Sequence, residues 1–387
     1  MSSKVFLKDV CTRICSGGTP KRSVEEYYKN GRIPWLNTSE IKFNRIRKTT
    51  NFITDAGLEN SSAKWIESNS VVVAMYGATA GKVAISKIPL TTNQACCNLE
   101  IDPSIADYRY IYYWLKSRND LLTNLTNGGA QQNLNAQIIK NLEINLPSIG
   151  IQARIANHLS LLDDKIELNN QLNDYLAKLV SLEFEKQFGA NTPAVDLSNV
   201  LDISTKTVKP QDYMEEIWEH YSIPAFDEAR WPTFEPANKI KSNKYVIDGN
   251  CILISKLNPS IKRLWIPPCI TSRSVCSTEF IVYKPKKPEY KSFYNAAIDS
   301  DSFSNYLLQH VTGSTGSRQR SQPKATLTYP IPNPDEKQIA FFCAFADPIY
   351  NQIRNNEIEC QKLKTLRDLL LPKLVTGEIN SSVIDIM

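Results

Sequence analysis

The sequence has little of what metal centres and histidine-based active sites require. It contains only three histidines, which lie far apart, and none of its nine cysteines belongs to a C-x-x-C pair. Structural zinc needs close pairs of such ligands, so we expect no metal site in this chain. A Cys–His or Ser–His site assembled in space stays open as an alternative. We expect most of the cysteines to be small buried residues with reduced thiols.

Long apolar runs and cofactor fingerprints are also missing. No stretch approaches the ~18 uninterrupted apolar residues of a membrane span, and residues 1–4 open no signal peptide, so we expect a cytoplasmic protein. The segment from Gly77 to Lys82 resembles a phosphate-binding loop, but it is one residue short. Val83 also stands where such a loop needs Ser or Thr. We therefore expect no nucleotide or other cofactor on this chain.

What is present is the composition of an ordinary globular protein. The 387 residues suffice for two or three domains, with 42% apolar and 22% charged residues. Disordered, collagen-like and low-complexity proteins are thereby excluded. The 45 Lys and Arg residues exceed the 40 Asp and Glu residues by five, which favours an anionic partner only weakly.

A weak but ordered repeat relates the two halves of the chain. The offset between matching residues is 190 near the start of each half, 180 in the middle and 185 near the end. Small drifts of this kind are typical of loop insertions between two copies of one fold. The matches include Ile33-Pro34 with Ile223-Pro224, 71–74 with 251–254, Lys82 with Lys262, Cys96 with Cys276, and Leu146-Pro147 with Ile331-Pro332.

Each half ends in a long segment whose seam residues are spaced alternately four and three apart. This spacing is typical of a coiled coil, and ~38 residues at 1.5 Å each predict helices about 55 Å long. Asn169 and Asn356 take equivalent seam positions, where a polar residue fixes register and partner. Two unrelated amphipathic helices are the alternative; we predict that the two pack antiparallel and hold the globular halves apart. The seams comprise Ile155, Leu159, Leu162, Ile166, Asn169, Asn173, Leu176 and Val180, and Ile349, Ile353, Asn356, Cys360, Leu363, Arg367, Leu370 and Leu374.

The globular halves mix short strands with helices. Segments 70–74 and 250–254 are β-branched or apolar and bounded by turn residues, which predicts buried strands, and 107–125 has a helical apolar stripe. We predict an α+β protein with two mixed α/β domains in a pseudo-twofold arrangement, separated by two long antiparallel coiled-coil helices. The predicted segments are domain 1 (1–149), the first long helix (150–189), domain 2 (190–335), the second long helix (336–379) and a C-terminal tail (380–387).

Polar and cationic residues gather in the predicted loops of both halves. Arg, Asn and Gln can read base edges, whereas Lys neutralises phosphates, so the pattern favours DNA binding. For any single residue, a solvated loop surface is the alternative. The predicted DNA contacts are Lys21, Arg22, Asn37, Tyr76, Thr79, Lys82, Asn93, Gln94, Gln131, Gln132, Asn133, Lys206, Lys209, Lys256, Asn258, Lys262, Arg263, Arg273, Arg318, Gln319 and Arg320.

Several of these segments together resemble one protein family. Gly17-Gly18-Thr19-Pro20, Ile33-Pro34-Trp35-Leu36, the turn from Tyr76 to Ile85, Gln131-Gln132-Asn133-Leu134 and Leu371-Pro372-Lys373-Leu374 are similar to the specificity subunit of type I restriction-modification systems. The resemblance runs from about residue 4 to residue 379. The second half departs from it, with Thr207-Val208-Lys209-Pro210 in place of G-G-T-P and Leu257 in place of Gly77.

The resemblance implies a non-catalytic subunit. Each target-recognition domain would read one part of a bipartite double-stranded DNA sequence. The paired helices would set the spacing of the parts and dock two modification subunits. Those methyltransferase subunits would carry S-adenosylmethionine, and restriction (helicase-nuclease) subunits would carry ATP and Mg²⁺. The alternatives are the specificity subunit of another multi-subunit restriction system, and a coiled-coil scaffold that binds only proteins.

Overall fold

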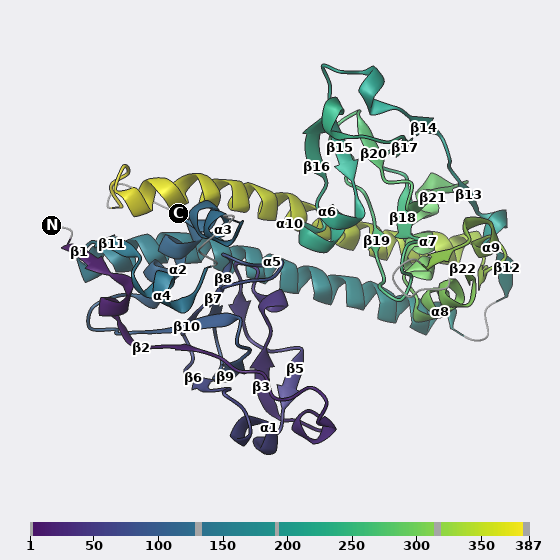
Figure 1. The fold of residues 1–387 in the computed structure, drawn as a ribbon. Helices are drawn as coiled ribbons and strands as arrows, with labels where there is room; N and C mark the ends of the chain where they lie inside the picture. The colour runs from purple at the N-terminus through teal and green to yellow at the C-terminus, as the bar shows by residue number, and fades with distance from the viewer. Residues whose placement is uncertain (1–2, 128–133, 190–192, 313–318, 382–387) are drawn as a thin grey trace. The chain divides into compact units, whose positions relative to one another are not determined.

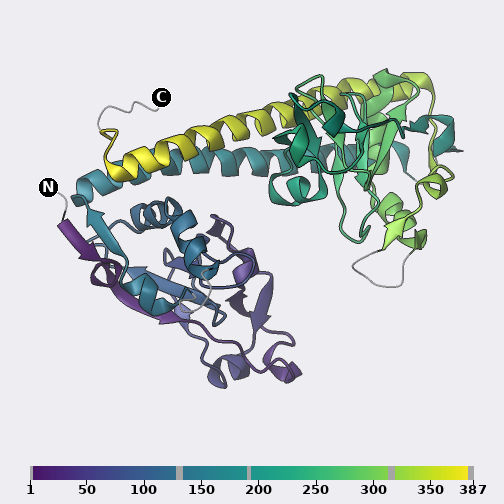
Figure 2. The same cartoon turned by 45° about the horizontal axis from the view of Figure 1, so that its top comes forward.

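The computed structural model describes residues 3–127, 134–189, 193–312 and 319–381. It divides into two compact units: unit 1 comprises Met1–Ile166 and Lys362–Met387, and unit 2 comprises Glu167–Gln361. Two long helices contribute one part to each unit (Figures 1 and 2). Within the described ranges, no helix is long and apolar enough to cross a membrane. The five-segment division expected from the sequence stays a prediction.

Unit 1 is built on two sheets. The main sheet has the order β2-β10-β7-β8-β4, and its neighbours are antiparallel except for β4 and β8. The interior strands β7 and β8 are buried along their whole length, which explains their nearly continuous apolar sequence. The second sheet has the order β5-β3-β9-β6, and β1 pairs with β11. The strands are β1 (Ser3–Phe6), β2 (Cys11–Ser16), β3 (Ile33–Leu36), β4 (Arg45–Ile46), β5 (Asn51–Ile53), β6 (Trp65–Ile66), β7 (Val71–Ala74), β8 (Val83–Ser86), β9 (Leu90–Thr92), β10 (Cys96–Ile101) and β11 (Glu143–Leu146).

The helix expected over 107–125 is two helices. It breaks after Lys116, where the Ser117 hydroxyl donates a hydrogen bond to the Trp114 carbonyl and competes with the helical pattern. The predicted apolar stripe is nevertheless buried, with Tyr110 and Leu122 both inaccessible to solvent. The helices are α1 (Asp55–Glu59), α2 (Tyr108–Lys116), α3 (Asn119–Asn127) and α4 (Ala136–Lys140), with short 3₁₀ helices η1 (Leu7–Val10), η2 (Glu25–Tyr27) and η3 (Thr38–Glu40).

Unit 2 also has two sheets and several small helices. One sheet has the order β13-β21-β18-β19 and the other β14-β17-β20-β15-β16, while β12 pairs with β24 and β22 with β23. The strands are β12 (Ala194–Asp196), β13 (Leu201–Ile203), β14 (Thr207–Val208), β15 (Ile217–Tyr221), β16 (Thr233–Pro236), β17 (Lys244–Val246), β18 (Ile252–Ser255), β19 (Leu264–Trp265), β20 (Ser274–Cys276), β21 (Phe280–Pro285), β22 (Val311–Thr312), β23 (Arg320–Ser321) and β24 (Pro330–Pro332). The helices are α6 (Ile223–Ala229), α7 (Lys291–Ile298), α8 (Asp301–Gln309) and α9 (Pro323–Thr326).

The two units repeat one strand topology, which confirms the internal repeat. The order β2-β10-β7-β8 in unit 1 corresponds to β13-β21-β18-β19 in unit 2. In both second sheets a central parallel pair, β3–β9 or β15–β20, is flanked by antiparallel strands. Unit 1 has one extra strand in its main sheet, β4, beside β8. The corresponding stretch of unit 2 forms α6 instead.

The register of the repeat differs from the sequence matches by a few residues. The Ala74 N–H donates to the Lys82 carbonyl, and the Ser255 N–H donates to the Arg263 carbonyl in the same way. Arg263 is therefore the structural equivalent of Lys82, and the match with Lys262 is wrong by one residue. Likewise, Ile33-Pro34 lies in β3, whereas Ile223-Pro224 begins α6.

The two long helices are α5 (Ile149–Phe188) and α10 (Glu336–Thr376). In unit 2 they run antiparallel, because Asn169 Nδ2 donates to Glu359 Oε2 while Asn173 Oδ1 accepts from Asn356 Nδ2, both at 2.7 Å. In unit 1 the Arg367 guanidinium pairs with Asp163 at 2.6 Å. The predicted seam is confirmed: nine of its sixteen members are buried, and the other seven are partly buried. The nine buried members are Ile155, Leu159, Leu162, Ile166, Asn169, Val180, Asn356, Cys360 and Leu374.

Candidate nucleic-acid interface

In unit 1, a tight turn after β7 presents two of the predicted contacts. Gly77 and Gly81 have φ angles of +90° and +84°, which residues with a Cβ rarely adopt. The Thr79 hydroxyl fixes the turn by donating to the Thr38 carbonyl at 2.6 Å. Tyr76 is 45% exposed, and the Lys82 ammonium makes no ion pair with any residue in the described ranges. The turn thus offers an aromatic ring and a cation from a rigid backbone.

A second group of predicted contacts lies around the Gly17-Gly18 segment. This segment passes so close to the chain that a Cβ on Gly18 would lie 2.2 Å from the Ala63 nitrogen. The Thr19 hydroxyl bonds to Gln94 just beyond it. Asn93 Nδ2 donates to Asn37 Oδ1 at 3.2 Å. The fold therefore brings Thr19 and Asn37 to Gln94 and Asn93, which follow them by 75 and 56 residues in the sequence.

An open hollow of about 460 Å³ adjoins this group. Arg22 and Asn37 line it, with the rings of Tyr28 and Trp35 at its wall in an edge-on arrangement with centroids 5.9 Å apart. The Trp35 indole donates to the Gly18 carbonyl at 2.9 Å, so the wall is tied to the close-packed glycine segment. Lys21 and Arg22 are both exposed. This hollow combines a guanidinium and amides on a rigid aromatic support.

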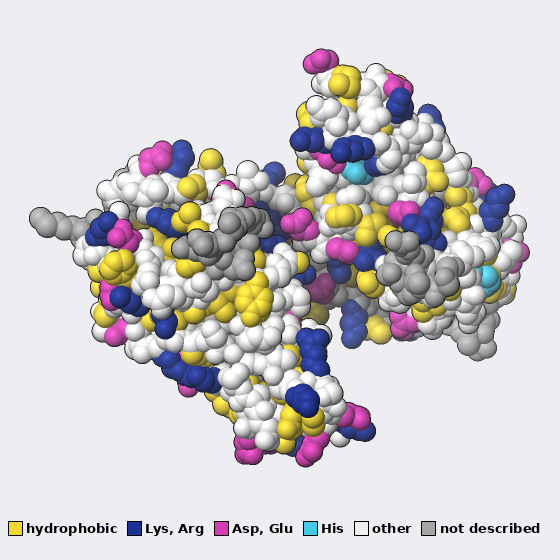
Figure 3. Space-filling model, viewed as in Figure 1, with side chains coloured by type: hydrophobic (Ala, Val, Ile, Leu, Met, Phe, Trp, Pro, Cys, Tyr) yellow, Lys and Arg dark blue, Asp and Glu magenta, His cyan; other side chains and the backbone are white. Residues whose placement is uncertain are grey.

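In unit 2, most predicted cationic contacts already have acidic partners. Arg263 is buried and holds Asp227 with two hydrogen bonds, at 2.6 and 2.8 Å. Such a pair is costly to break, because one charge would be left unpaired. The remaining pairs are Lys262 with Asp299 at 2.6 Å, Arg320 with Glu279 at 2.9 Å, Arg273 with Glu216 at 2.5 Å and Lys209 with Asp212 at 3.3 Å. On the face of the molecule in Figure 3, basic and acidic side chains are interspersed.

The other predicted contacts of unit 2 form one small cluster and one isolated residue. The Asn258 N–H donates to the Gln319 carbonyl at 2.9 Å, and the Ser321 N–H donates to the Lys256 carbonyl at 2.9 Å. Lys256, Asn258 and Gln319 therefore lie together, whereas Lys206 is exposed elsewhere. Gln131, Gln132, Asn133 and Arg318 lie outside the described residues.

A buried carboxylate that the sequence analysis missed organises a loop next to Arg273. Glu219 is fully buried in β15 and accepts hydrogen bonds from the Tyr221 hydroxyl, the Ile270 and Thr271 N–H groups and the hydroxyls of Thr271 and Ser274. Burial alone raises the pKa of Glu219, but these donors outweigh it and the net pKa is lowered. No spacing pattern in the sequence marks this residue, because four of its five donors come from residues 270–274, more than 50 residues away.

The cysteines are mostly buried free thiols, as expected from the sequence. All nine are free thiols, and six of them are buried. Burial raises the pKa of the Cys251 and Cys343 thiols to about 11, so they stay protonated near neutral pH.

A second apolar stripe on α5 also escaped the sequence analysis, although its signal was present. Its five members follow the same four-three spacing as the seam but are exposed, between 43% and 73%. They are Leu168, Leu172, Tyr175, Leu179 and Leu182. A helix face of this kind is typical of a surface that another helix covers.

Comparison with known proteins identifies relatives of the chain. Residues 2–178 match the family model described as type I restriction modification DNA specificity domain. The chain is 24% identical over 423 residues to the type I restriction enzyme MjaIX specificity subunit of Methanocaldococcus jannaschii, a match covering 96% of this chain and 92% of that protein. It is 28% identical over 177 residues to the EcoR124I/EcoR124II specificity subunit of Escherichia coli, covering 44% of this chain and 43% of that one. The crystal structure of a type I restriction-modification S subunit from M. genitalium has the same fold, with a TM-score of 0.57, 19% identity and coverage of 96% and 95%.

Proposed function

We propose that this chain, which is similar to the specificity subunits of type I restriction-modification systems, is the non-catalytic DNA-reading component of a modification and restriction complex. Each unit would read one part of a bipartite double-stranded DNA target. S-adenosylmethionine would be bound by methyltransferase subunits docked on the long helices, and ATP and Mg²⁺ by restriction subunits. The duplicated topology carries the proposal: one scaffold occurs twice, with different polar side chains on each copy.

The difference between the copies supports the reading of two different half-sequences. In unit 1 the turn with Tyr76 and Lys82 and the hollow with Arg22 offer side chains with few competing partners. In unit 2 the equivalent of Lys82 is Arg263, whose charge is matched by Asp227. Unit 2 would therefore depend on other side chains, among which Lys256, Asn258 and Gln319 form the best candidates.

The exposed apolar stripe supports the docking of modification subunits. Asn169 and Asn356 occupy equivalent seam positions, and the same offset places Leu179 and Leu182 of α5 on Leu366 and Leu369 of α10. All four leucines are at least 42% exposed. Two equivalent pairs of exposed leucines fit two copies of one partner, as a complex with two modification subunits requires.

Co-expression with the cognate modification subunit, followed by mapping of methylated adenines in the genome, tests the proposal. A bipartite methylated sequence that disappears when this chain is omitted is the expected result. The scaffold alternative predicts methylation that does not depend on this chain. It also predicts binding that is insensitive to salt, whereas phosphate contacts make log K fall by about 0.9 per contact with log[salt].

We expect Lys82→Ala to weaken DNA binding by the whole complex about fivefold for every sequence tested. A lost charge-assisted contact at a partly exposed site is worth roughly 1 kcal/mol, and a phosphate contact carries no base preference. Lys262→Ala should have a smaller effect, because that ammonium is engaged by Asp299. Fluorescence anisotropy at several salt concentrations measures both, with Lys4→Ala as the surface control. A change of base preference in Lys82→Ala would show that this residue reads sequence instead.

A further inference from the structure

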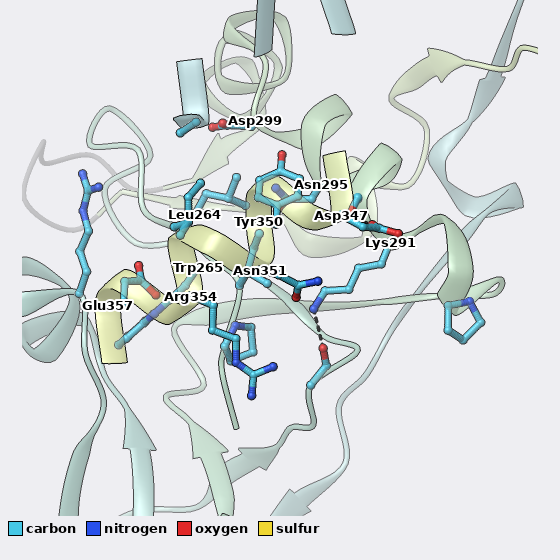
Figure 4. A pocket seen from close by; sticks show the side chains of 18 of the residues that line it. Leu264, Trp265, Lys291, Asn295, Asp299, Asp347, Tyr350, Asn351, Arg354 and Glu357 are labelled. Carbon is cyan, nitrogen blue, oxygen red and sulfur yellow. Dashed lines mark hydrogen bonds between the residues drawn. The ribbon is translucent and has the colours of Figure 1, made fainter. Parts of the chain in front are cut away.

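A pocket of about 570 Å³ lies inside unit 2, beside the last strand of its main sheet. Its walls come from Leu264 and Trp265 of β19, from α6 and α7, and from one face of α10 (Figure 4). The size is that of a ligand site rather than a packing defect. The repeat between the two units indicates what kind of ligand fits this pocket, because in unit 1 a strand covers the equivalent edge of the main sheet.

In unit 1 this edge is covered by β4. The Ile85 N–H of β8 donates to the Asn44 carbonyl at 3.0 Å, and the Lys87 N–H donates to the Ile46 carbonyl at 2.8 Å. The Arg45 side chain then reaches α5, where its guanidinium pairs with Asp164. A two-residue extended segment therefore seals the gap between sheet and helix, held by backbone hydrogen bonds and one arginine.

In unit 2 the corresponding edge is open. The pairing of Trp265 with Leu253 matches that of Ala84 with Val72, so Ile266 takes the place of Ile85. In the part of the chain that the structure describes, the Ile266 N–H makes no hydrogen bond. Pro268 takes the place of Lys87 and has no N–H. One backbone donor thus remains for an added strand, and the prolines limit how far pairing can extend.

The helix side of the pocket offers carboxylates to a cation. Asp347 and Glu357 both lie on the face of α10 that borders the pocket, near opposite ends of it in Figure 4. Glu357 makes no ion pair or hydrogen bond within the described ranges, and Asp347 accepts one from the Ser292 hydroxyl. Of the cations that line the pocket, Lys262 is engaged by Asp299, Lys291 by the Gly249 carbonyl and Arg354 by the Pro268 carbonyl. The fourth, Arg230, lies over the Phe226 ring.

We propose that this pocket binds an extended, arginine-bearing segment of a partner polypeptide, which adds to β19 as β4 adds to β8 in unit 1. Strand addition to an open sheet edge takes its affinity from main-chain hydrogen bonds and its specificity from side-chain pockets. Here the Ile266 N–H and carbonyl would pair with the segment, and its guanidinium would reach Glu357. The inference goes beyond the proposed function, since the site requires neither DNA nor base recognition.

The probe is a synthetic peptide with the sequence of residues 41–50 of this chain, which contains β4, carrying a photo-crosslinker in place of Phe43. We expect binding to the full chain that saturates below about 1 mM, with cross-links on residues 262–267 and 347–357. An Arg45→Glu peptide should bind at least tenfold more weakly. Glu357→Gln in the protein should weaken the parent peptide about tenfold, as expected for a lost charge-assisted bond. Asp347→Asn should weaken it less, because that carboxylate already accepts a hydrogen bond from Ser292.

Glu336→Gln is the matched control, because Glu336 lies on the same helix but pairs with Lys287 outside the pocket. It should leave peptide binding unchanged. The proposal is overturned if the peptide does not bind, if the Arg45→Glu peptide binds equally well, or if the cross-links map elsewhere, including to the sheet edge of unit 1. Each of these outcomes leaves the proposed DNA reading untouched, which the methylation map tests separately.

We expect the Glu357→Gln variant to stay folded, so that any loss of peptide binding reports on the site itself. The pH dependence of its stability is a separate prediction. Burial raises the pKa of Glu357 to about 7, although Arg230 from the end of α6 and Arg354 from α10 itself both lower it. Because the folded-state pKa is raised, the carboxyl group favours folding most below about pH 4.5, and this contribution is lost as pH rises through 7. The variant should therefore have a higher melting temperature than the parent chain at pH 8 but not at pH 4.5. An equal difference at both pH values would contradict this assignment.

Discussion

Replacing both Leu179 and Leu182 with glutamate should leave the chain folded but remove one of the two modification subunits from the complex. Both leucines are about half exposed on α5, so the free chain tolerates a charge there. Docking can bury only the exposed half of each leucine, so each substitution loses roughly 0.7–1.5 kcal/mol of apolar burial. Desolvation of each new carboxylate costs several kcal/mol more. A total of at least about 4 kcal/mol corresponds to roughly a thousandfold weaker docking. Native mass spectrometry of the co-expressed complex measures the stoichiometry directly.

The equivalent pair on the other helix provides the matched experiment. Leu366→Glu with Leu369→Glu should remove the other modification subunit, and the variant with all four substitutions should bind none. Asp174→Lys is the control, because residue 174 is exposed on α5 but lies on another face of the helix. Successive residues are rotated by about 100° around the helix axis, which places Asp174 that far from Tyr175 of the stripe. Full occupancy in the four-fold variant would show that modification subunits dock elsewhere.

Glu219→Ala should destabilise unit 2 by about 3–5 kcal/mol. The substitution leaves several buried donors without their acceptor, among them the Tyr221 hydroxyl and the Ile270 and Thr271 N–H groups. An unsatisfied buried donor costs roughly 1–3 kcal/mol, and the substitution leaves several such donors at once. Hydrogen exchange, followed residue by residue, should show faster exchange in the loop 269–274 and in β15.

The pH dependence of this site has a definite sign. Because the pKa of Glu219 is lowered in the folded chain, its contribution to stability is present above the unfolded value of about 4.5 and is lost as pH falls. The parent chain and Glu219→Ala should therefore differ less at pH 3 than at pH 7. Glu216→Gln serves as the control, since that carboxylate is partly exposed and should cost less than about 1 kcal/mol. A loss below 1 kcal/mol in Glu219→Ala would contradict the role assigned to this residue.

The architecture was accessible from the sequence because it depends on periodic apolar patterns. The seam from Ile155 to Val180 and the buried strands around 71–74 follow from spacing alone, and the repeat appears as a drifting offset. The register of the repeat was not accessible. Lys82 matches Lys262 in the sequence, but two equivalent hydrogen bonds, from the Ala74 N–H to the Lys82 carbonyl and from the Ser255 N–H to the Arg263 carbonyl, make Arg263 its structural counterpart. Sequence matches of single residues cannot resolve such a shift.

The candidate site was less predictable than the fold. The sequence identifies cations such as Arg320 and Arg273 but not the carboxylates that pair with them in the fold. Arg320 pairs with Glu279, and Arg273 pairs with Glu216. Whether a side chain is available to a ligand depends on such long-range pairs. The open edge of β19 was equally hidden, since it results from the replacement of an extended segment by α6 in an otherwise equivalent unit.

The buried amides between α5 and α10 have a consequence for how the chain is made. The seam of α5 finds its partner only when α10 emerges, about 150 residues later, or roughly 7–30 s later at 5–20 residues per second. Until then the apolar seam is open to any other helix in the cell. Asn169 and Asn173 make a wrong match costly, since their amides would be buried without Glu359 and Asn356. Asn169 and Asn173 thus disfavour non-native helix pairing of α5 during synthesis, and the same two side chains later fix its register against α10.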